Sequence, residues 1–160
     1  MGMILSTLRG FHVCVPRNMV QAACMYNTLL QSNDPGLVIE VLNSYRLKEN
    51  LPENIGEMTL AFGVPEILQQ GSDITIVSYG ATLRIIQQAI KIVAPLGISC
   101  ELIDVQTLLP FDIHHEILKS LQKTNRIVFV DEDVPGGATA CMYNKVLEEQ
   151  GGYKYLDVAA

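Results

Sequence analysis

The sequence predicts an α/β protein with three layers, in which helices cover both faces of a mostly parallel sheet. Two observations support this fold class. From residue 73 onward, short runs of β-branched and aliphatic residues alternate with longer amphipathic segments, an order typical of parallel strands joined by right-handed crossover helices. Hydrophobic residues make up 49% of the 160 residues, which is enough for a packed core and argues against a mainly disordered chain.

Residues 1–42 are expected to form a strand, a helix and a second strand. Phe11–Pro16 is a short β-prone run, and Asn18 is a good N-cap for the helix after it, with Gln21 placed as in a capping box. The helical spacing of apolar residues continues to a Pro-Gly turn. Leu37–Leu42 is then a near-continuous apolar run, which is typical of a strand covered on both faces.

Residues 43–71 show no clear periodicity. Charged residues are frequent in this stretch, and Pro52, Gly56, Gly63 and Pro65 interrupt it. Because prolines and glycines favour turns and irregular backbone, we interpret the stretch as a linker that crosses between two domains.

Residues 72–160 repeat the order of strand and helix three times, and we expect them to form the second domain. A turn at Gly80 separates the first strand from a helix with one apolar face, while Arg84 and Lys91 lie on the opposite face. The expected strands are Ile74–Tyr79, Ile98–Ile103, Arg126–Val130 and Tyr155–Val158, and the expected helices are Thr82–Val93, a helix capped by Asp112, and Ala138–Glu149.

The charge and cysteine content exclude several classes of protein. The chain has 11 basic and 17 acidic residues, a net charge of -6 and no Trp, so we expect no nucleic-acid partner. Cys14, Cys24, Cys100 and Cys141 are too widely spaced for a zinc motif or a disulfide framework, which favours a reducing, cytoplasmic location. The first residues do not read as a signal peptide or an anchor, so no membrane partner is expected.

Acidic residues gather at the ends of the predicted strands, the edge at which open α/β sheets place their sites. In the turn Asp131–Gly137 a glycine pair precedes a helix, and a helix start can hold an anion. Three carboxylates stand directly before that helix, however, and they oppose a phosphate. Two interpretations stay open: a tight acidic turn whose glycines allow close approach of another element, or an acidic surface for a basic partner.

The histidines do not form an expected metal site. His114 and His115 are adjacent, so on a helix their side chains point about 100° apart. Together with Asp112 and Glu116 they are more typical of a solvated first helical turn. His12, within a β-prone run, is interpreted as a packed or partner-facing imidazole, and the residues alone show no complete catalytic set.

Several motifs occur in the same order as in a known family. They are Gly71–Gly80, Glu101–Asp112, Lys119–Arg126 and Asp131–Gly137, preceded by Gly10–Pro16 and Asn33–Glu40. The series resembles the C-terminal domain of transketolase-like enzymes. More narrowly, it is similar to the beta subunit, or the beta half of a fused form, of the thiamine-diphosphate-dependent decarboxylating component of 2-oxo acid dehydrogenases. Residues 1–42 resemble the last β-α-β of that family's pyrimidine-binding domain.

The resemblance implies an enzyme that decarboxylates a 2-oxo acid, of the pyruvate or branched-chain type, on thiamine diphosphate and Mg²⁺ and passes the acyl group to a lipoyl arm. It implies three partners: an alpha subunit or alpha half, a second beta copy, and the lipoyl acyltransferase. The family's catalytic glutamate would lie upstream of residue 1, and the diphosphate-magnesium site would lie on the alpha partner. We therefore assign no catalytic or cofactor-binding residue, and expect no cofactor and no activity in these residues alone.

Two further sites are implied by the resemblance. Backbone carbonyls of Leu29, Ser32 and Asp34 match positions that hold a structural monovalent cation. The second site, a contact surface for partner subunits, comprises Asp131, Glu132, Asp133, Gly136 and Gly137.

The chain also departs from the family pattern. Gln106 stands where many relatives carry Arg, which puts in doubt any salt bridge made there. The family continues past Val158 with a further strand and helix, so we expect the sequence to be a fragment of a longer subunit. Two alternatives remain: a fragment of another transketolase-fold enzyme, such as transketolase or deoxyxylulose-phosphate synthase, or a free-standing flavodoxin-like binding module.

Overall fold

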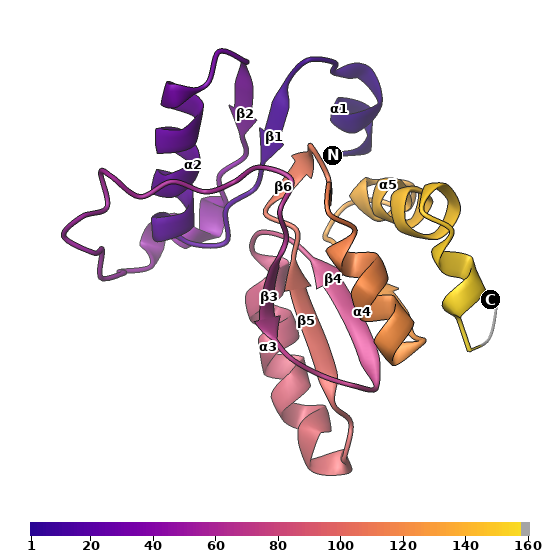
Figure 1. Cartoon of the computed structure of the whole chain (residues 1–160). Helices are drawn as coiled ribbons and strands as arrows, with labels where there is room; N and C mark the ends of the chain where they lie inside the picture. Colours follow the sequence, from indigo (N-terminus) through magenta and orange to yellow (C-terminus); the bar gives the residue numbers. More distant parts are fainter. Residues whose placement is uncertain (158–160) are drawn as a thin grey trace.

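The structure, a computed structural model, describes residues 1–157 and contains two small sheets with helices around them (Figure 1). Within these residues, one sheet has the strand order β2-β1-β6 and the other has the order β3-β5-β4-β7. The predicted α/β class with a mostly parallel sheet is confirmed.

The first sheet begins with the predicted strand, helix and strand. α1 precedes them and packs beside α5. The elements are α1 (Gly2–Thr7), β1 (His12–Cys14), α2 (Met19–Gln31) and β2 (Gly36–Val38), with β1 and β2 parallel. The Asn18 side chain accepts a hydrogen bond from the Gln21 backbone at 2.8 Å, and the Gln21 side chain accepts one from the Arg17 backbone at 2.7 Å. These bonds satisfy backbone donors at the helix start, as the capping pattern predicted.

The prediction for Leu37–Leu42 is wrong in its extent. β2 ends at Val38, and residues from Leu42 onward form the short helix η1 (Leu42–Arg46). β2 is an edge strand, and none of its residues is buried. An apolar run therefore did not require a strand covered on both faces here, because the chain turns away after three paired residues.

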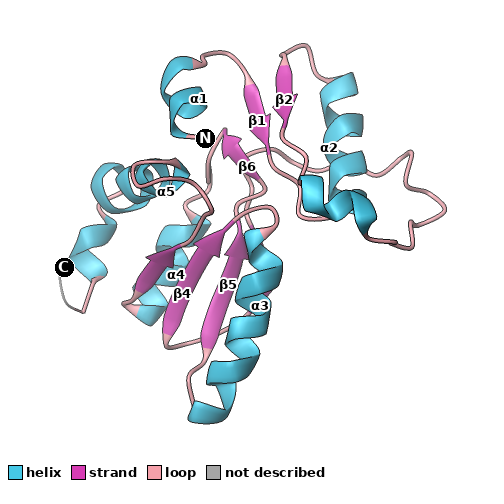
Figure 2. Ribbon diagram, turned by 180° about the vertical axis from the view of Figure 1, so that it is seen from behind, coloured by secondary structure: helices cyan, strands magenta, loops and turns pink. Residues whose placement is uncertain are grey.

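The second sheet forms the middle of three layers. Its elements are β3 (Glu66–Gln69), β4 (Ile74–Ser78), β5 (Cys100–Asp104) and β7 (Ile127–Phe129), connected through α3 (Thr82–Val93), η2 (Ala94–Leu96) and α4 (Glu116–Thr124). The strands β5, β4 and β7 are parallel, and β3 is antiparallel at one edge. Figure 2 shows α3 in front of this sheet and α4 behind it.

The two faces of the second sheet have separate apolar clusters. Leu83, Ile86 and Ile90 of α3 pack against Cys100 and Leu102 on one face. The other face packs against α4 and α5 (Ala138–Tyr143), which continues as the π-helix η3 (Asn144–Glu149). This arrangement places the strand ends that carry the acidic turn on the same edge as the first sheet.

Strand β6 (Thr107–Leu109) connects the two sheets. It follows β5 after two residues but pairs with β1 of the first sheet, antiparallel, with Val13 opposite Leu109 and Cys14 opposite Thr107. Val13 and Val15 share one buried cluster with Val77 of β4 and residues of β5. The two segments that the sequence analysis assigns to different domains therefore share a sheet and an apolar core.

Three details differ from the sequence-based expectations. The interval 43–71, expected to be a linker, contributes β3 to the sheet. The helix capped by Asp112 begins later than expected, at Glu116. Asp112 is buried rather than solvated, and its carboxylate accepts hydrogen bonds from the backbones of Glu116 and Ile117 at 2.8 and 3.0 Å. The last expected strand is wrong for Tyr155, which ends the helix η4 (Gly152–Tyr155), and Val158 lies outside the described residues.

Candidate functional site

A cavity of about 380 Å³ lies where the second sheet meets the first. Its walls are the turn after β4, from Tyr79 to Thr82, the acidic turn after β7, and residues of the first sheet that include Val15 and Ile39. From β4 the chain continues to β5, which is the neighbour of β4 on one side. It then crosses over to β7, which is the neighbour of β4 on the other side. The cavity thus occupies the switch point of the parallel strands, the place at which open α/β sheets bind ligands.

Carboxylates dominate the polar lining of this cavity. Glu40, Glu132 and Asp133 contribute to its wall. Glu40 accepts hydrogen bonds from the hydroxyls of Tyr26 and Tyr45, which lower its pKa. Burial raises the pKa of the Tyr79 phenol, and the nearby carboxylates of the acidic turn raise it further, so this hydroxyl stays protonated. The Met1 ammonium also lines the cavity and lies 2.7 Å from Asp133, so Glu40 and Glu132 are the carboxylates left to accept hydrogen bonds and favour positive charge.

The residues of the acidic turn divide into internal and exposed groups. Asp131 accepts a hydrogen bond from the Thr139 backbone at 2.8 Å and so caps α5. Asp133 accepts one from the Gly2 backbone at 3.2 Å, and Gly137 is buried against it. Glu132 and Gly136 are exposed. Of the five residues expected to contact a partner, the structure leaves these two most open, and the other three organise the turn.

The three residues of the expected cation site lie together at the end of α2. The Leu29 carbonyl accepts a hydrogen bond from the Ser32 backbone at 3.0 Å, and the Ser32 hydroxyl accepts one from the Asp34 backbone at 3.1 Å. The Asp34 carboxylate is 3.7 Å from the His12 imidazole. This turn follows α2, whereas the acidic turn precedes α5.

A polar cluster that is buried around Asp104 and exposed at Glu66 joins the two sheets, and the sequence did not reveal it. Arg17, in the turn before α2, lies 2.5 Å from the Asp104 carboxylate at the end of β5 and 2.8 Å from Glu66 of β3. The Gln21 amide donates to Asp104 at 3.0 Å. We name the group of Arg17, Gln21, Glu66, Asp104 and Gln106 the junction cluster. Burial raises the pKa of Asp104 and the hydrogen bonds from Gln21 and Arg17 oppose that rise.

Gln106 makes no salt bridge, and its amide is used for hydrogen bonds instead. Its side-chain oxygen accepts from Gln21 at 2.6 Å, and its nitrogen donates to the Val64 carbonyl at 2.8 Å. Its φ of 60° lies in the left-handed region, which places the residue at the sharp turn between β5 and β6. The cation that pairs with Asp104 is Arg17.

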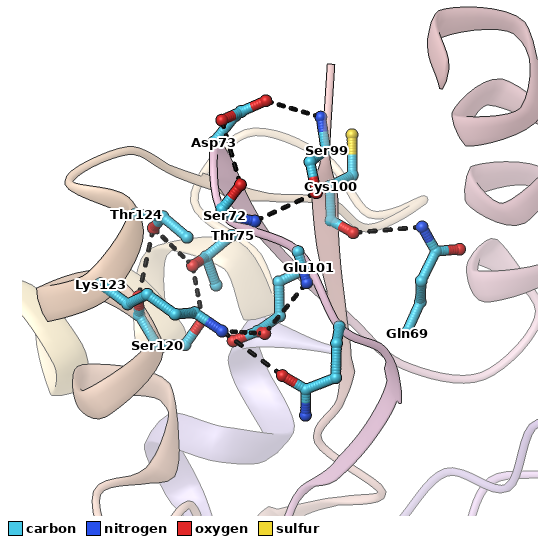
Figure 3. A network of polar contacts seen from close by, with 12 residues as sticks. Gln69, Ser72, Asp73, Thr75, Ser99, Cys100, Glu101, Ser120, Lys123 and Thr124 are labelled. Atoms are coloured by element: carbon cyan, nitrogen blue, oxygen red, sulfur yellow. Dashed lines mark hydrogen bonds and ion pairs between the residues drawn. The ribbon is translucent and has the colours of Figure 1, made fainter. Parts of the chain in front are cut away.

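Glu101, a second buried carboxylate on β5, lies three residues before Asp104 and belongs to a network of polar contacts (Figure 3). Lys123 of α4 forms an ion pair with Glu101 of β5, and the Gly71 backbone donates to the same carboxylate at 3.3 Å. Beside it, the Thr75 hydroxyl lies 2.6 Å from that of Ser120. These contacts tie α4 to the sheet, away from the cavity, so we assign them a structural role.

The other residues considered from the sequence lie away from the cavity. Three of the four cysteines are buried and Cys141 is half-buried, and burial raises the pKa of Cys14 to about 12, so its thiol is unreactive near neutral pH. His114 and His115 are exposed, and the His12 ring packs against Phe62 with ring centres 4.8 Å apart. Among residues 1–157, His, Cys, Asp and Glu side chains form no group of three that could hold a metal ion.

The cavity does not fit the diphosphate of thiamine diphosphate. Three carboxylates line it, and the Met1 ammonium in the same lining lies 2.7 Å from one of them, Asp133. These carboxylates would repel a diphosphate that carries no metal ion.

A family model agrees with the topology. The model of the transketolase C-terminal domain matches residues 63–160, which include the whole second sheet and β6. The chain belongs to the transketolase C-terminal domain family. The resemblance inferred from the motifs is therefore confirmed.

Curated relatives extend the similarity into the first sheet. The mitochondrial 2-oxoisovalerate dehydrogenase subunit beta of Dictyostelium discoideum is 32% identical over 88% of this chain and 38% of its own length. The pyruvate dehydrogenase E1 component subunit beta of Acholeplasma laidlawii is 30% identical over 98% of this chain and 47% of its own length. The chain spans less than half of either relative.

A solved structure has the same arrangement of elements. A split-gene transketolase, described as an inactive beta4 tetramer, matches with a TM-score of 0.76 and 25% identity over 92% of this chain and 46% of that chain. The match supports the placement of the two sheets relative to one another.

In the described part of the chain, every helix is too short or too polar to cross a bilayer.

Proposed function

We propose that this chain is part of the beta subunit of a thiamine-diphosphate-dependent 2-oxo acid dehydrogenase. The observation that carries the proposal is the pair of relatives named as beta subunits of such enzymes, whose similarity runs across both sheets. In the complete enzyme, thiamine diphosphate would supply the chemistry that allows a 2-oxo acid to lose carbon dioxide. The residues described here hold the subunit together and present surfaces to partners.

The first role is assembly. β6 pairs with β1 at the edge of the first sheet and the junction cluster lies beside it, so the two sheets are fixed to one another. We propose that this fixed unit supports contacts with an alpha subunit and with a second beta copy. A monovalent cation held by the backbone carbonyls of Leu29, Ser32 and Asp34 would stabilise the end of α2. Thiamine diphosphate and Mg²⁺ would be held by other parts of the enzyme.

The second role is docking of the lipoyl acyltransferase. The acidic turn supplies an exposed carboxylate at Glu132 and exposed backbone at Gly136, and a basic surface would complement the charge. Asp131, Asp133 and Gly137 would act by shaping the turn. Cytoplasmic location belongs to the same proposal.

The test expresses the complete reading frame that contains this sequence together with its alpha partner. With thiamine diphosphate and Mg²⁺, the assembly should decarboxylate pyruvate or a branched-chain 2-oxo acid and reduce an artificial electron acceptor. Failure with every 2-oxo acid would contradict the proposal. In the same assembly, Glu132→Lys should weaken acyltransferase binding while decarboxylation with the artificial acceptor is unchanged, and Glu148→Lys, at another exposed position, serves as the matched control.

One alternative has a specific observation in its favour. The split-gene transketolase shares the arrangement of both sheets. The same assembly should then transfer two-carbon units between sugar phosphates and should not act on 2-oxo acids. The two assays therefore separate the alternatives.

A further inference from the structure

The cavity at the switch point of the second sheet is lined by polar groups of opposite kinds. Glu40, from the end of the first sheet, and Glu132, from the acidic turn, are the carboxylates that are left to attract positive charge. Asp133 is already engaged by the Met1 ammonium at 2.7 Å. The start of α3 also lines the cavity, and it brings hydrogen-bond donors instead of acceptors. A single cation or a single anion would therefore satisfy only one of the two kinds of group.

Helix α3 begins at the wall of this cavity without a side-chain cap. Its N-cap residue is Ala81, whose methyl group cannot accept a hydrogen bond from the first helical turn. The Thr82 hydroxyl donates to the Tyr79 carbonyl at 2.8 Å and so is used elsewhere. The first N–H groups of a helix have no partner within the helix and form its positive end. This wall of the cavity therefore favours a negatively charged oxygen.

A buried tyrosine hydroxyl independently indicates a ligand with an acceptor oxygen. Tyr79 is 6% exposed and lines the cavity, yet its hydroxyl makes no hydrogen bond of 3.5 Å or less with the groups that the structure describes. The hydroxyl is not among the fully enclosed polar atoms of the described residues, so it is open to the cavity. The nearby Asp131 carboxylate already accepts backbone hydrogen bonds from Asp133 and Thr139. Because buried polar groups are nearly always hydrogen-bonded, this donor calls for an acceptor from a bound molecule.

The rest of the lining is aliphatic and the cavity is small. Val15, Ile39 and Val41 contribute to the wall, and the volume is about 380 Å³. This volume lies toward the lower end of the range for small-molecule sites, about 300–1,000 Å³. The ligand must therefore combine a positive group, a negative group and an apolar part in a small molecule. A zwitterion has no net charge, so it avoids the repulsion that the carboxylates would exert on a free diphosphate.

We propose that this cavity binds an α-amino acid with an aliphatic side chain. Glu40 and Glu132 hold its ammonium group, and the Tyr79 hydroxyl and the start of α3 hold its carboxylate. The aliphatic side chain packs against the apolar wall, where burial of apolar area adds to the affinity. An aliphatic amine or an aliphatic carboxylate would leave one set of polar groups without a partner. This inference does not depend on which reaction the complete enzyme catalyses.

The experiment follows proton–nitrogen NMR correlation spectra of the full chain during titration with L-leucine. The amide signals of Gly80, Thr82 and Glu132 should shift together and saturate. Those of Gly71 and Lys123, at the opposite end of the strands, should not move. Three analogues each lack one part of leucine: isopentylamine lacks the carboxylate, isocaproate lacks the ammonium group, and glycine lacks the aliphatic side chain. Each analogue should bind at least about ten-fold more weakly than leucine.

Two variants assign the two ends of the ligand. Tyr79→Phe should weaken leucine binding by about five-fold or more and leave isopentylamine binding unchanged, because only the carboxylate loses a partner. Glu40→Gln should weaken the binding of leucine and of isopentylamine and leave isocaproate binding unchanged. Tyr153→Phe and Glu148→Gln, at exposed positions, are the matched controls and should leave every affinity unchanged. Circular dichroism checks that each variant is folded.

Three outcomes would overturn the inference. The first is that leucine causes no saturable shifts at Gly80 and Thr82, and the second is that one of the analogues binds as tightly as leucine. The third is that Tyr79→Phe and Glu40→Gln bind leucine as tightly as the control variants do. The first two outcomes are measured on the unmodified chain, so they decide the question even if a variant fails to fold.

Discussion

Two ion pairs on the same strand differ in how their carboxylates are supported. Asp104 and Glu101 are both on β5, and both side chains are almost wholly inaccessible. Arg17 pairs with Asp104 from a side chain that is 22% exposed, whereas Lys123 pairs with Glu101 from one that is 43% exposed. Burial raises the pKa of Asp104. For Glu101 burial acts in the same direction, but hydrogen bonds from Lys123, Ser120 and Gly71 outweigh it and lower the pKa.

Asp104 connects the two sheets, whereas Glu101 connects one sheet to a helix that covers it. Asp104 lies where the chain leaves one sheet for the other, and its side-chain partners Arg17 and Gln21 are 87 and 83 residues away, at the start of α2. Glu101 is held by α4 and by the turn before β4, elements that belong to the same sheet and its helix layer. The ionised form of Asp104 is therefore the less stabilised of the two, and it depends more on its single cation.

The largest effect is expected from Arg17→Met. The substitution leaves the Asp104 carboxylate buried without its cation, and removal of one partner of a buried pair costs about 3–5 kcal/mol. Urea unfolding followed by circular dichroism gives the free energy of unfolding. Because the chain has no Trp, tyrosine fluorescence is the second probe.

A double variant tests the physical reason for that loss. Arg17→Met together with Asp104→Asn removes both charges, and it should recover at least half of the stability lost by the single variant. A single Arg17→Met variant within about 0.5 kcal/mol of the unmodified chain would contradict the importance of the junction cluster. The two probes should also separate in the single variant if the two sheets begin to unfold independently.

Lys123→Met should have a smaller effect, of about 1–3 kcal/mol, since Glu101 keeps its contacts with Ser120 and Gly71. The same urea experiment measures it. The order of the two losses in stability tests the comparison. If Lys123→Met costs more than Arg17→Met, the Lys123–Glu101 pair contributes more to stability than the Arg17–Asp104 pair.

The pH dependence of stability should have opposite signs for the two carboxyls. The pKa of Asp104 is raised by folding, so its ionisation removes stability as pH rises above about 3.9 and through the folded pKa. The pKa of Glu101 is lowered, so its contribution is present above about 4.3 and is lost as pH falls through the folded pKa. Each pKa unit corresponds to about 1.4 kcal/mol.

Two variants isolate these contributions. Relative to the unmodified chain, Asp104→Asn should gain stability as pH rises, and Glu101→Gln should lose stability over the same range. The free energy of unfolding is measured by urea titration between pH 3 and pH 7, a range chosen to bracket the ordinary carboxyl pKa values of about 4. Slopes of the same sign for both variants would contradict the assignment.

The smallest effect is expected at an exposed pair. Lys145 lies 2.7 Å from Glu149 one helical turn later, and both side chains are 40% or more exposed. Lys145→Met should change the free energy of unfolding by about 0.5 kcal/mol or less, because exposed pairs gain little in water. A loss comparable to that of Lys123→Met would show that burial is not what distinguishes these pairs.

The sequence predicted what depends on local pattern. The helix Thr82–Val93 has the expected bounds, and the capping of α2 by Asn18 occurs as expected, because both follow from residues within a few positions of one another. The strand at Ile74 and the glycine turn after it were likewise readable from a short window.

The missed features depend on distant partners. β3 and β6 are four and three residues long, and each becomes a strand only by pairing with a strand far away in sequence. The junction cluster combines Arg17 with Asp104, which are 87 residues apart, so no spacing rule could join them. The exposure of Ile85 and Ile92 on α3 is also nonlocal, since it follows from which part of the apolar arc the sheet covers. The expected cation and partner sites remain predictions.

Strand β6 also limits how this region can be exchanged between proteins. The family model matches residues 63–160, a range that includes β6. Its first residue, Gly63, donates a backbone hydrogen bond to the Thr107 side chain of β6 at 2.8 Å. The strand with which β6 pairs, β1, falls outside that range. Recombination that moved residues 63–160 alone would transfer β6 without β1, the strand with which it pairs. The unpaired edge of β6 could then pair with another chain. A transplantable module must therefore include β1, and its natural start lies about fifty residues before the family boundary, near His12.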